Sequence, residues 1–445
     1  MIVDLVLVNA KAFLKQGITE CSISVNEGKI HKIGKEVNMP KSDRRLNLNS
    51  MLILPGLIDV HVHLRDEGKA YKEDFLTGTA AAAAGGFTSV IDMPNNEPVT
   101  MSIATLRNRM KIAEKRIFVN VGFRSEFPEN PGEIGGIAKE GAFGFKLFMT
   151  NQVGGLNLDD DQAILESFKK VSRSGLSTAV HAEDMKSLKD AENQLRKNGK
   201  NDLSSFLKAH SPDVEVQAVK RVLNLAQKAS MRLHFCHITT HEALEIISKK
   251  KSEIQASSEV TPHNLLLSLK ELKKVGNLGL MMPPIRDEEQ VAGLWEGIRQ
   301  KSIDMIASDH APHALKEKES ESVWSVKVGI PGLETTLPLL LTEVKRGRLS
   351  IDDLARLLSE KPADVFGIRG KGHVTLGGDA DLTVVDLHRT FKIDSSKFKS
   401  KAKFSPFDGR EVQGKAVKTF VGGQLVMDEG EIVAKAGSGR ILRRQ

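Results

Sequence analysis

Cysteine is nearly absent from this chain of 445 residues, which contains only Cys21 and Cys236, far apart in the sequence. Two cysteines cannot build a disulfide framework or a thiolate zinc site. We therefore expect a reducing, cytoplasmic location. The first 20 residues also lack the pattern of a secretory leader, because Asp4 and Asn9 interrupt the apolar run and no cleavage site follows.

Long apolar runs and a strong excess of one charge are also missing. No run approaches the ~18 residues that a membrane-spanning helix needs. The 64 basic and 57 acidic residues leave a formal net charge of +7. The basic residues are scattered, and denser runs such as 249–251 lie in stretches with a helical pattern. We interpret them as solvated helix faces, so the sequence predicts neither a nucleic-acid partner nor a membrane partner.

The composition and length are those of a globular protein with one large and one small domain. Hydrophobic residues make up 40% of the chain and charged residues 27%. Short strand patterns separated by glycine turns fill residues 1–54 and 370–445. We predict that these two ends form a small composite β-sandwich domain and that residues 55–369 form a second, larger domain.

The middle of the chain alternates between short apolar runs and helical patterns. Eight runs rich in Val, Ile, Leu and Phe are predicted strands, at 57–63, 89–93, 118–123, 144–149, 177–181, 232–237, 254–260 and 305–308. Repeated strand–helix units imply parallel strands with right-handed crossovers, and eight of them fit an α/β fold of the (β/α)8 TIM-barrel type. A doubly wound open sheet is the alternative, but it predicts a glycine-rich phosphate loop after the first strand, which this sequence lacks.

The end of the first predicted barrel strand carries His61 and His63. Residues two apart on a strand point to the same side, so these imidazoles can bind one metal ion. The pair alone is a weak signal. In a barrel, however, the chemistry lies where the strands end at the C-terminal face. Four further strand ends carry polar residues: Lys146, His181, His237 and Asp309.

These six residues together favour a metal centre with two ions. Each has a simpler interpretation alone, since a strand-end histidine is more often hydrogen-bonded than metal-bound and Lys146 could pair with a carboxylate. Four imidazoles and one carboxylate do not fill two tetrahedral sites. Lys146 stands among apolar residues, where desolvation favours the neutral amine. A neutral amine can react with CO₂ to give a carbamate that bridges two metals, although the composition does not compel this step.

The order of these residues, and the motifs around them, resemble the amidohydrolase superfamily and, within it, the dihydroorotases. The resemblance covers nearly the whole predicted barrel and reaches the tail of the chain. The matching segments are residues 59–65, 92–95, 144–146, 180–184, 236–238, 259–263, 308–313 and 406–409.

The resemblance implies two Zn²⁺ ions per subunit, with N6-carboxylated Lys146 between them. Co²⁺ or Mn²⁺ would also suit such donors. In the implied mechanism a bridging hydroxide attacks a ring carbonyl, and Asp309 passes the proton to the leaving ring nitrogen. The implied metal ligands are His61, His63, Lys146, His181, His237 and Asp309.

The activity implied by the resemblance is reversible hydrolysis of (S)-dihydroorotate to N-carbamoyl-L-aspartate, in de novo pyrimidine (UMP) biosynthesis. Arg65, Asn95 and His313 stand at the positions where the family binds the substrate carboxylate. A planar guanidinium suits a carboxylate. Allantoinases and hydantoinases share the metal ligands but usually lack the arginine and the asparagine. Simpler interpretations are a surface ion pair for Arg65 and a turn for Asn95.

Three positions depart from the family pattern. Glu67 replaces a usual proline, Asn264 a usual histidine, and Met282 a usual asparagine near the pocket lip. None of the three is a metal ligand. Residues 149–158, with two adjacent glycines, are predicted to form a loop over the pocket.

The expected partners follow from the same resemblance. We expect a small-molecule substrate, a homo-oligomer, and an association with aspartate carbamoyltransferase. Two alternatives remain open. The chain could be another cyclic amidase, such as an allantoinase or hydantoinase, or a non-catalytic partner subunit of that transferase.

Overall fold

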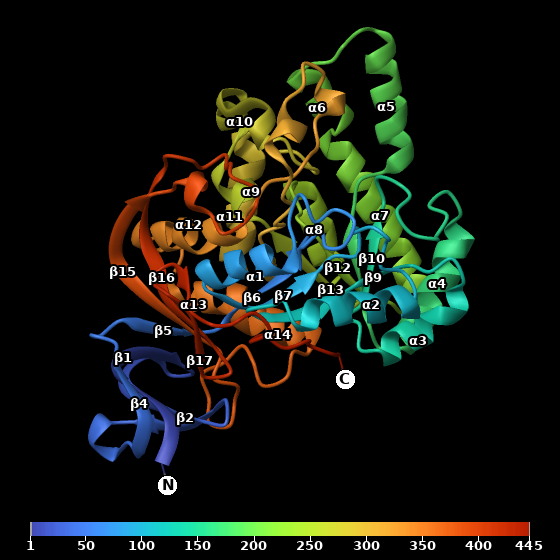
Figure 1. Ribbon diagram of the computed structural model, residues 1–445. Helices are drawn as coiled ribbons and strands as arrows, with labels where there is room; N and C mark the ends of the chain where they lie inside the picture. The colour runs from blue at the N-terminus through green and yellow to red at the C-terminus, as the bar shows by residue number, and fades with distance from the viewer. Residues whose placement is uncertain (1, 445) are drawn as a thin grey trace.

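The structure, a computed structural model, describes residues 2–444. A barrel of parallel strands surrounded by helices forms the larger part, and a sheet built from both chain ends lies beside it (Figure 1). Among the described residues, no helix is both long and apolar enough to cross a membrane.

The barrel strands pair in parallel throughout. Two segments, β8 and β9, are halves of one strand interrupted at Arg124, so nine segments make eight strands. The ring closes where Val62 pairs in parallel with His310. The predicted fold class is confirmed, and every predicted barrel strand is present. The segments are β6 (Leu57–Val62), β7 (Phe87–Asp92), β8 (Asn120–Phe123), β9 (Ser125–Glu126), β10 (Phe145–Phe148), β11 (Ser177–His181), β12 (Arg232–Phe235), β13 (Ala256–Val260) and β14 (Met305–Ile306).

Helices follow the strands and cover the outside of the barrel (Figure 1). The sequence marks their starts, because Asp, Ser or Thr side chains cap most of them. The helices are α1 (Phe75–Ala84), α2 (Ile103–Glu114), α3 (Ile134–Lys139), α4 (Asp161–Arg173), α5 (Met185–Lys197), α6 (Leu203–Ala209), α7 (Pro212–Ala229), α8 (His241–Lys250), α9 (Pro262–Leu266), α10 (Leu269–Val275), α11 (Glu288–Arg299), α12 (Leu333–Lys345), α13 (Ile351–Ala355) and α14 (Lys361–Phe366).

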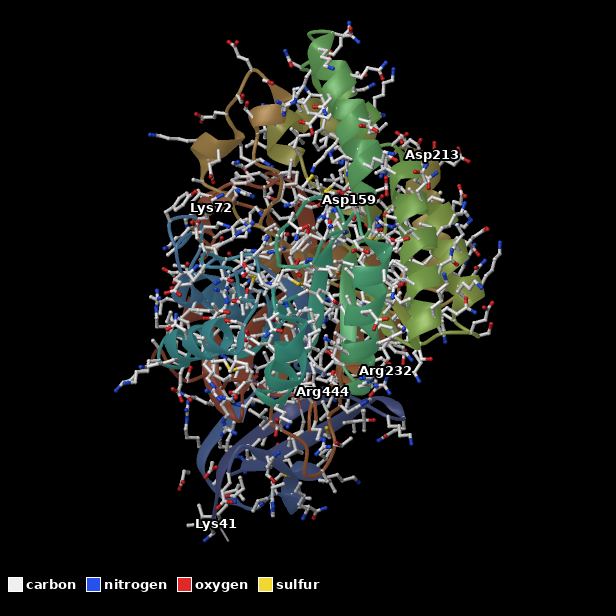
Figure 2. All side chains as sticks on the ribbon, turned by 90° about the vertical axis from the view of Figure 1, so that its right-hand side faces the viewer. Lys41, Lys72, Asp159, Asp213, Arg232 and Arg444 are labelled. Carbon is white, nitrogen blue, oxygen red and sulfur yellow. The ribbon has the colours of Figure 1, made fainter. Side chains whose placement is uncertain are left out.

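The direction of the strands places the site. Figure 2 shows Arg232, the first residue of β12, low in the molecule, and Asp159, which follows β10, well above it. Lys72, which follows β6, also lies high. The C-terminal ends of the strands therefore face the top of this view, where α5 and α6 project in Figure 1.

A nine-stranded sheet joins the two chain ends. Its order is β18-β17-β16-β15-β5-β1-β2-β3, and β4 pairs with β1. The N-terminal and C-terminal strands meet where β5 pairs antiparallel with β15. The strands are β1 (Ile2–Leu14), β2 (Gly17–Asn26), β3 (Lys29–Gly34), β4 (Lys41–Asn47), β5 (Leu52–Pro55), β15 (Leu382–Lys392), β16 (Glu411–Val421), β17 (Gln424–Asp428) and β18 (Glu431–Ile432).

The sheet and the barrel are packed closely. Gly86, between α1 and β7, has a φ of +90°, and a Cβ there would lie 2.8 Å from Thr383 and 3.1 Å from Ala416 of the sheet. Only glycine allows both this backbone and this approach. Residues 437–444 return to the barrel, where the backbone N–H of Leu442 donates to the carbonyl of Val121. The predicted domain bounds, 1–54 with 370–445 and 55–369, stay a prediction.

Candidate metal centre and substrate pocket

A cavity of about 210 Å³ lies at the C-terminal ends of the barrel strands. Eight of the nine residues predicted from the sequence line it: His61, His63, Arg65, Asn95, His181, His237, Asp309 and His313. The ninth, Lys146, is fully buried behind the wall, with its Nζ 4.9 Å from the ring centre of Phe148, which also lines the cavity. The barrel topology thus brings together residues that are up to 252 positions apart in the chain.

Three imidazoles and one carboxylate meet at the floor of this cavity. The ring centres of His61 and His63 lie 5.4 Å apart, and those of His61 and His237 5.2 Å apart. One oxygen of Asp309 is 3.2 Å from Nε2 of His61 and 3.2 Å from Nε2 of His63. The ligand atoms of these three residues all lie within 4.8 Å of one another, so they could hold one metal ion.

His181 and His237 form the second half of the cluster. Their ring centres are 4.6 Å apart. Within the described residues, neither ring nitrogen of His237 has a hydrogen-bond partner, and its Nδ1 is buried. An unpartnered buried polar atom is costly, and this one lies beside several other potential ligands. The arrangement fits a second metal ion bound by these two histidines.

Three of the four histidines, His61, His63 and His237, have a lowered pKa. Burial lowers the pKa of His61 to about 4, and the charge of Lys146 adds to this against the opposing carboxylates of Glu259 and Asp309. Burial also holds the pKa of His63 and His237 well below the usual value. The neutral imidazole is the form that binds a metal. The lowered pKa of these three imidazoles therefore favours the metal-binding form.

Lys146 has the surroundings expected of a modified lysine. Its Nζ lies 3.0 Å from Sγ of Cys236, and no carboxylate in the described chain lies within ion-pair distance of it. The simpler interpretation, a pair with a carboxylate, therefore does not apply. Burying an ammonium without a counter-charge is costly. A carbamate at this position would instead place an anion beside the histidine cluster.

Two buried glutamates stand behind the imidazoles, and the sequence analysis assigned neither of them. Glu259 pairs with Nδ1 of His61, and Glu183 lies 2.8 Å from Nε2 of His181. A carboxylate behind a ligating imidazole fixes its tautomer and its orientation. The signal was present, since Glu183 follows His181 by two residues and Glu259 stands near the end of a predicted strand.

Three of the site residues have a backbone conformation that is rare outside glycine. The φ angles of Arg65, His237 and Asp309 are 61°, 31° and 44°. Such a conformation costs about 1–3 kcal/mol and is often found at functional sites, although seven other non-glycine residues outside this cavity also have a positive φ. All three lie two or three residues beyond a strand end, where this conformation departs from strand geometry, and all three line the cavity.

Arg65 is the one buried cation that lines the cavity. Its side chain donates from Nε to the carbonyl of Pro312 at 3.3 Å, and no carboxylate in the described chain forms an ion pair with it. It is therefore not part of a surface ion pair. Burial lowers the pKa of Arg65 to about 10, so the group stays charged at neutral pH. A buried guanidinium without a carboxylate partner can bind an anion.

Asn95 and His313 differ in what they offer to a ligand. The Oδ1 of Asn95 is 2.7 Å from Nδ1 of His63, while its amide nitrogen has no partner among the described residues. His313 uses both ring nitrogens, one near Lys72 at 3.1 Å and the other at 3.0 Å from the carbonyl of Val328. The asparagine thus has a donor available to a ligand, whereas His313 contributes mainly to the shape of the wall.

Loops complete the wall. Thr150, Asn151 and Val153 line the cavity, as expected for the loop at 149–158, and Met282 lines it as well. Lys327 and the two residues after it also line the cavity and were not predicted from the sequence. They belong to a segment without regular secondary structure, so no periodic pattern marked them.

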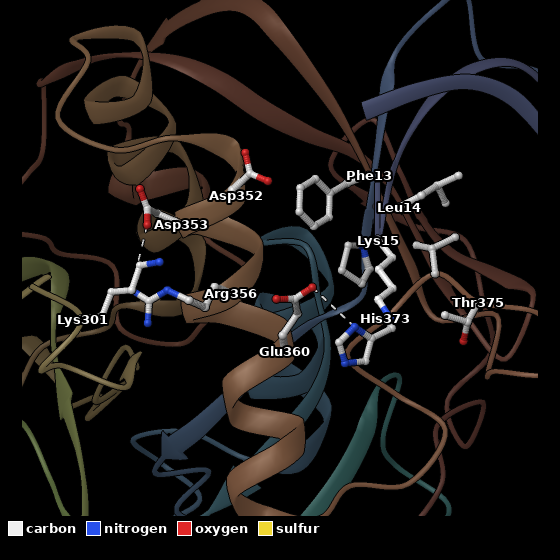
Figure 3. Close-up of a pocket in the computed structure, with 12 residues that line it drawn as sticks. Phe13, Leu14, Lys15, Lys301, Asp352, Asp353, Arg356, Glu360, His373 and Thr375 are labelled. Carbon is white, nitrogen blue, oxygen red and sulfur yellow. Dashed lines mark ion pairs between the residues drawn. The ribbon is translucent and has the colours of Figure 1, made fainter. Parts of the chain in front are cut away.

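A larger cavity, about 580 Å³, lies at the opposite end of the barrel (Figure 3). It is bordered by Pro55 before β6, by Lys301 before β14 and by residues of the terminal sheet such as Phe13. Figure 3 shows Asp353 near Arg356 and Glu360 near His373 across its wall. None of the predicted site residues lies there, so it is not the candidate active site.

Comparison with known proteins agrees with this geometry. A model of the amidohydrolase family matches residues 52–426. The dihydroorotase of Methanothermobacter thermautotrophicus is 36% identical over 95% of this chain and 94% of its own, and that of Pyrococcus horikoshii is 37% identical over 99% and 96%.

Hydantoinases resemble this chain to a degree comparable with these dihydroorotases. The L-hydantoinase of Paenarthrobacter aurescens is 33% identical over 99% of this chain and 98% of its own. The solved structure of L-hydantoinase (dihydropyrimidinase) from Arthrobacter aurescens superposes with a TM-score of 0.96, at 32% identity and full coverage of both chains. Overall similarity therefore does not separate the two activities.

Proposed function

The chain belongs to the amidohydrolase family, and we propose that it is a dihydroorotase, which interconverts (S)-dihydroorotate and N-carbamoyl-L-aspartate. The observation that carries this proposal is Arg65, a buried guanidinium on the cavity wall without a carboxylate partner. Dihydroorotate has a carboxylate outside the bond that breaks, and the parent hydantoin ring has none. A ring with this anion would complete the pocket.

The metal centre of the proposed enzyme would hold two Zn²⁺ ions, or Co²⁺ or Mn²⁺. Bound metals would lower the pKa of a water molecule and polarise the ring carbonyl. N6-carboxylated Lys146 would supply the anion shared between the two sites. The residues that would hold the ions are His61, His63, Lys146, His181, His237 and Asp309.

The chain's own residues would do the remaining work. Arg65 and the amide nitrogen of Asn95 would fix the ring through its carboxylate, with His313 shaping the wall beside them. Asp309, 3.2 Å from two imidazoles and open to the cavity, would take a proton from the attacking water and give it to the ring nitrogen that leaves. The reverse reaction would use the same groups to close the ring.

This activity would place the protein in de novo pyrimidine (UMP) biosynthesis. The homo-oligomer and the association with aspartate carbamoyltransferase stay predictions. A hydantoinase is the second candidate, because an L-hydantoinase is 33% identical over nearly the full length.

One assay separates the candidates. Purified protein loaded with Zn²⁺ is incubated with dihydroorotate, hydantoin or allantoin, and ring opening is followed by ultraviolet absorbance. We expect turnover of dihydroorotate with a kcat/KM at least about 100-fold above that of the other rings, as expected for a buried charge-assisted contact. Faster turnover of hydantoin or allantoin, or no turnover of dihydroorotate, would contradict the proposal.

A further inference from the structure

Three lysines lie at the substrate cavity or beside residues that line it, and one of them, Lys327, has no partner among the described residues. Lys69 donates from Nζ to the carbonyl of Asn95 at 2.9 Å, and Lys72 forms an ion pair with Glu317 at 2.9 Å. Lys327 lines the cavity, and within residues 2–444 its Nζ has neither a hydrogen bond nor an ion pair. The positive charge of Lys327 is therefore available to a ligand.

The backbone of Lys327 is held in place although its side chain is exposed. Its N–H donates to the carbonyl of Glu317 at 2.9 Å. Its carbonyl accepts from Nζ of Lys318 at 2.9 Å. Lys318 is almost fully buried and also donates to the carbonyls of Leu280 and Gly329, at 3.0 and 3.1 Å. These hydrogen bonds fix the backbone of Lys327 at the edge of the cavity.

The charges around the cavity are not balanced. Arg65 and Lys327 line it as cations, and the one carboxylate that lines it, Asp309, already faces the histidine cluster. Burial lowers the pKa of Lys72, and the positive charges of Arg65 and Lys327 add to this effect against Glu317. Arg65 and Lys327 thus both lie within electrostatic range of Lys72, and an anion in the cavity they line would offset this local excess of positive charge.

We propose that Lys327 is a second cation for the carboxylate of the substrate and that it acts with Arg65 to select acidic rings over neutral ones. This inference rests on the proposed function and deepens it. Dissolved ions screen the charge of an exposed ammonium, so its effect on substrate binding must fall as ionic strength rises. It would act on substrate and transition state alike, so KM should change more than kcat.

The test compares the holoenzyme with Lys327→Gln, Lys327→Arg and Lys316→Gln. Lys316 is an exposed lysine of the same loop that does not line the cavity, and it serves as the matched control. kcat and KM for dihydroorotate are measured at about 20 mM and about 500 mM salt, with Debye lengths of roughly 20 Å and 4 Å. Melting temperatures show whether each variant is folded.

We expect Lys327→Gln to lower kcat/KM about tenfold at low salt, mainly through KM, and about twofold at high salt. Lys327→Arg should stay within about threefold of the natural protein, since it keeps the charge. Lys316→Gln should stay within about twofold. The kcat/KM of the ring-closing reaction must fall by the same factor as that of the ring-opening reaction, because a substitution cannot change the equilibrium constant.

Two results would overturn the inference while leaving the proposed function intact. One is a kcat/KM of Lys327→Gln within twofold of the natural protein at low salt. The other is a loss that is independent of salt or confined to kcat, since that would indicate a change in the wall rather than a missing charge. A natural protein that does not turn over dihydroorotate would overturn the proposed function itself, and the inference with it.

Discussion

The two ends of the barrel carry two cavities of opposite character. The one at the N-terminal ends of the strands is the larger, about 580 Å³ against about 210 Å³. Its charged lining is balanced, with three cations and three anions on mostly exposed or half-buried side chains: Lys15, Lys301, Arg356, Asp352, Asp353 and Glu360. The smaller cavity is lined largely by buried polar side chains: His61, His63, Arg65, Thr150, His181, His237, Asp309 and His313.

The difference shows which property marks a functional site. Volume favours the wrong end of this molecule. Burying polar and charged groups together costs stability, so a protein that keeps them together needs them for another purpose. Three non-glycine residues of the smaller cavity, Arg65, His237 and Asp309, also have a positive φ, against one residue, Lys301, of the larger cavity.

The largest expected effect is at Lys146. Lys146→Ala should reduce activity to background, a loss above about 1,000-fold, because it removes a group shared by both metal positions rather than a supporting contact worth 10- to 100-fold. Turnover and bound metal are measured together, and acetate or propionate should restore part of the activity. Lys301→Ala, in the opposite cavity, is the control and should keep full activity. An active protein whose mass shows unmodified Lys146 would exclude the carbamate.

The second largest effect is at Arg65. Arg65→Met should cost about 2–4 kcal/mol of transition-state stabilisation for dihydroorotate, roughly 30- to 1,000-fold in kcat/KM, because the substrate carboxylate loses a buried charge-assisted partner. Arg356→Met removes the corresponding cation from the larger cavity and should leave kcat/KM unchanged. Equal losses in both variants would mean that the two cavities do not differ in function.

The sequence predicted those parts of the site that regular structure determines. Apolar runs located all eight barrel strands, and because strand ends meet at one face, His61, His181 and Asp309 could be placed together although they are far apart in the chain. Lys146 was predicted on its strand in the same way, and it is buried behind the wall of the cavity.

Features that depend on irregular segments could not be predicted in this way. Lys327 reaches the cavity because Lys318 binds three backbone carbonyls, and no pattern in the sequence indicates which carbonyls those are. The interruption of one barrel strand at Arg124 could not be predicted from the sequence either. The pairing of Glu183 and Glu259 with imidazoles could not be predicted, because it depends on the positions of the side chains.

At the base of the barrel, we expect a substitution of Lys371 to change stability rather than activity. Nζ of Lys371 pairs with Asp379 at 2.8 Å and with Asp381, and both Lys371 and Asp381 are buried. Lys371→Met should lower the free energy of unfolding by about 3 kcal/mol, since it leaves a buried carboxylate unpaired. Urea denaturation measures this loss, and kcat/KM should stay within about twofold. Lys345→Met, at an exposed position, is the control and should change stability by less than about 0.5 kcal/mol.

The same residue gives a pH dependence of defined sign. Burial opposes the charge of Lys371, but Asp381 and Asp379 outweigh it and raise the pKa of Lys371 above its usual value. The ion pair therefore contributes its full stability below the unfolded pKa of about 10.4, and this contribution is lost as pH rises through the higher folded value. The difference between the natural protein and Lys371→Met should be constant between pH 7 and 9 and should shrink above pH 11. A difference that grows with pH would contradict this assignment.

The smallest effect is expected at the ion pair between His373 and Glu360 on the wall of the larger cavity. The two groups lie 3.4 Å apart, and their side chains are 45% and 29% exposed. Water competes for both groups, so His373→Gln should change the free energy of unfolding by less than about 0.5 kcal/mol and leave kcat/KM unchanged. Denaturation and turnover of dihydroorotate measure the two quantities. A loss of kcat/KM beyond about threefold in a folded protein would show that the larger cavity affects the reaction, and the distinction between the two ends of the barrel would then fail.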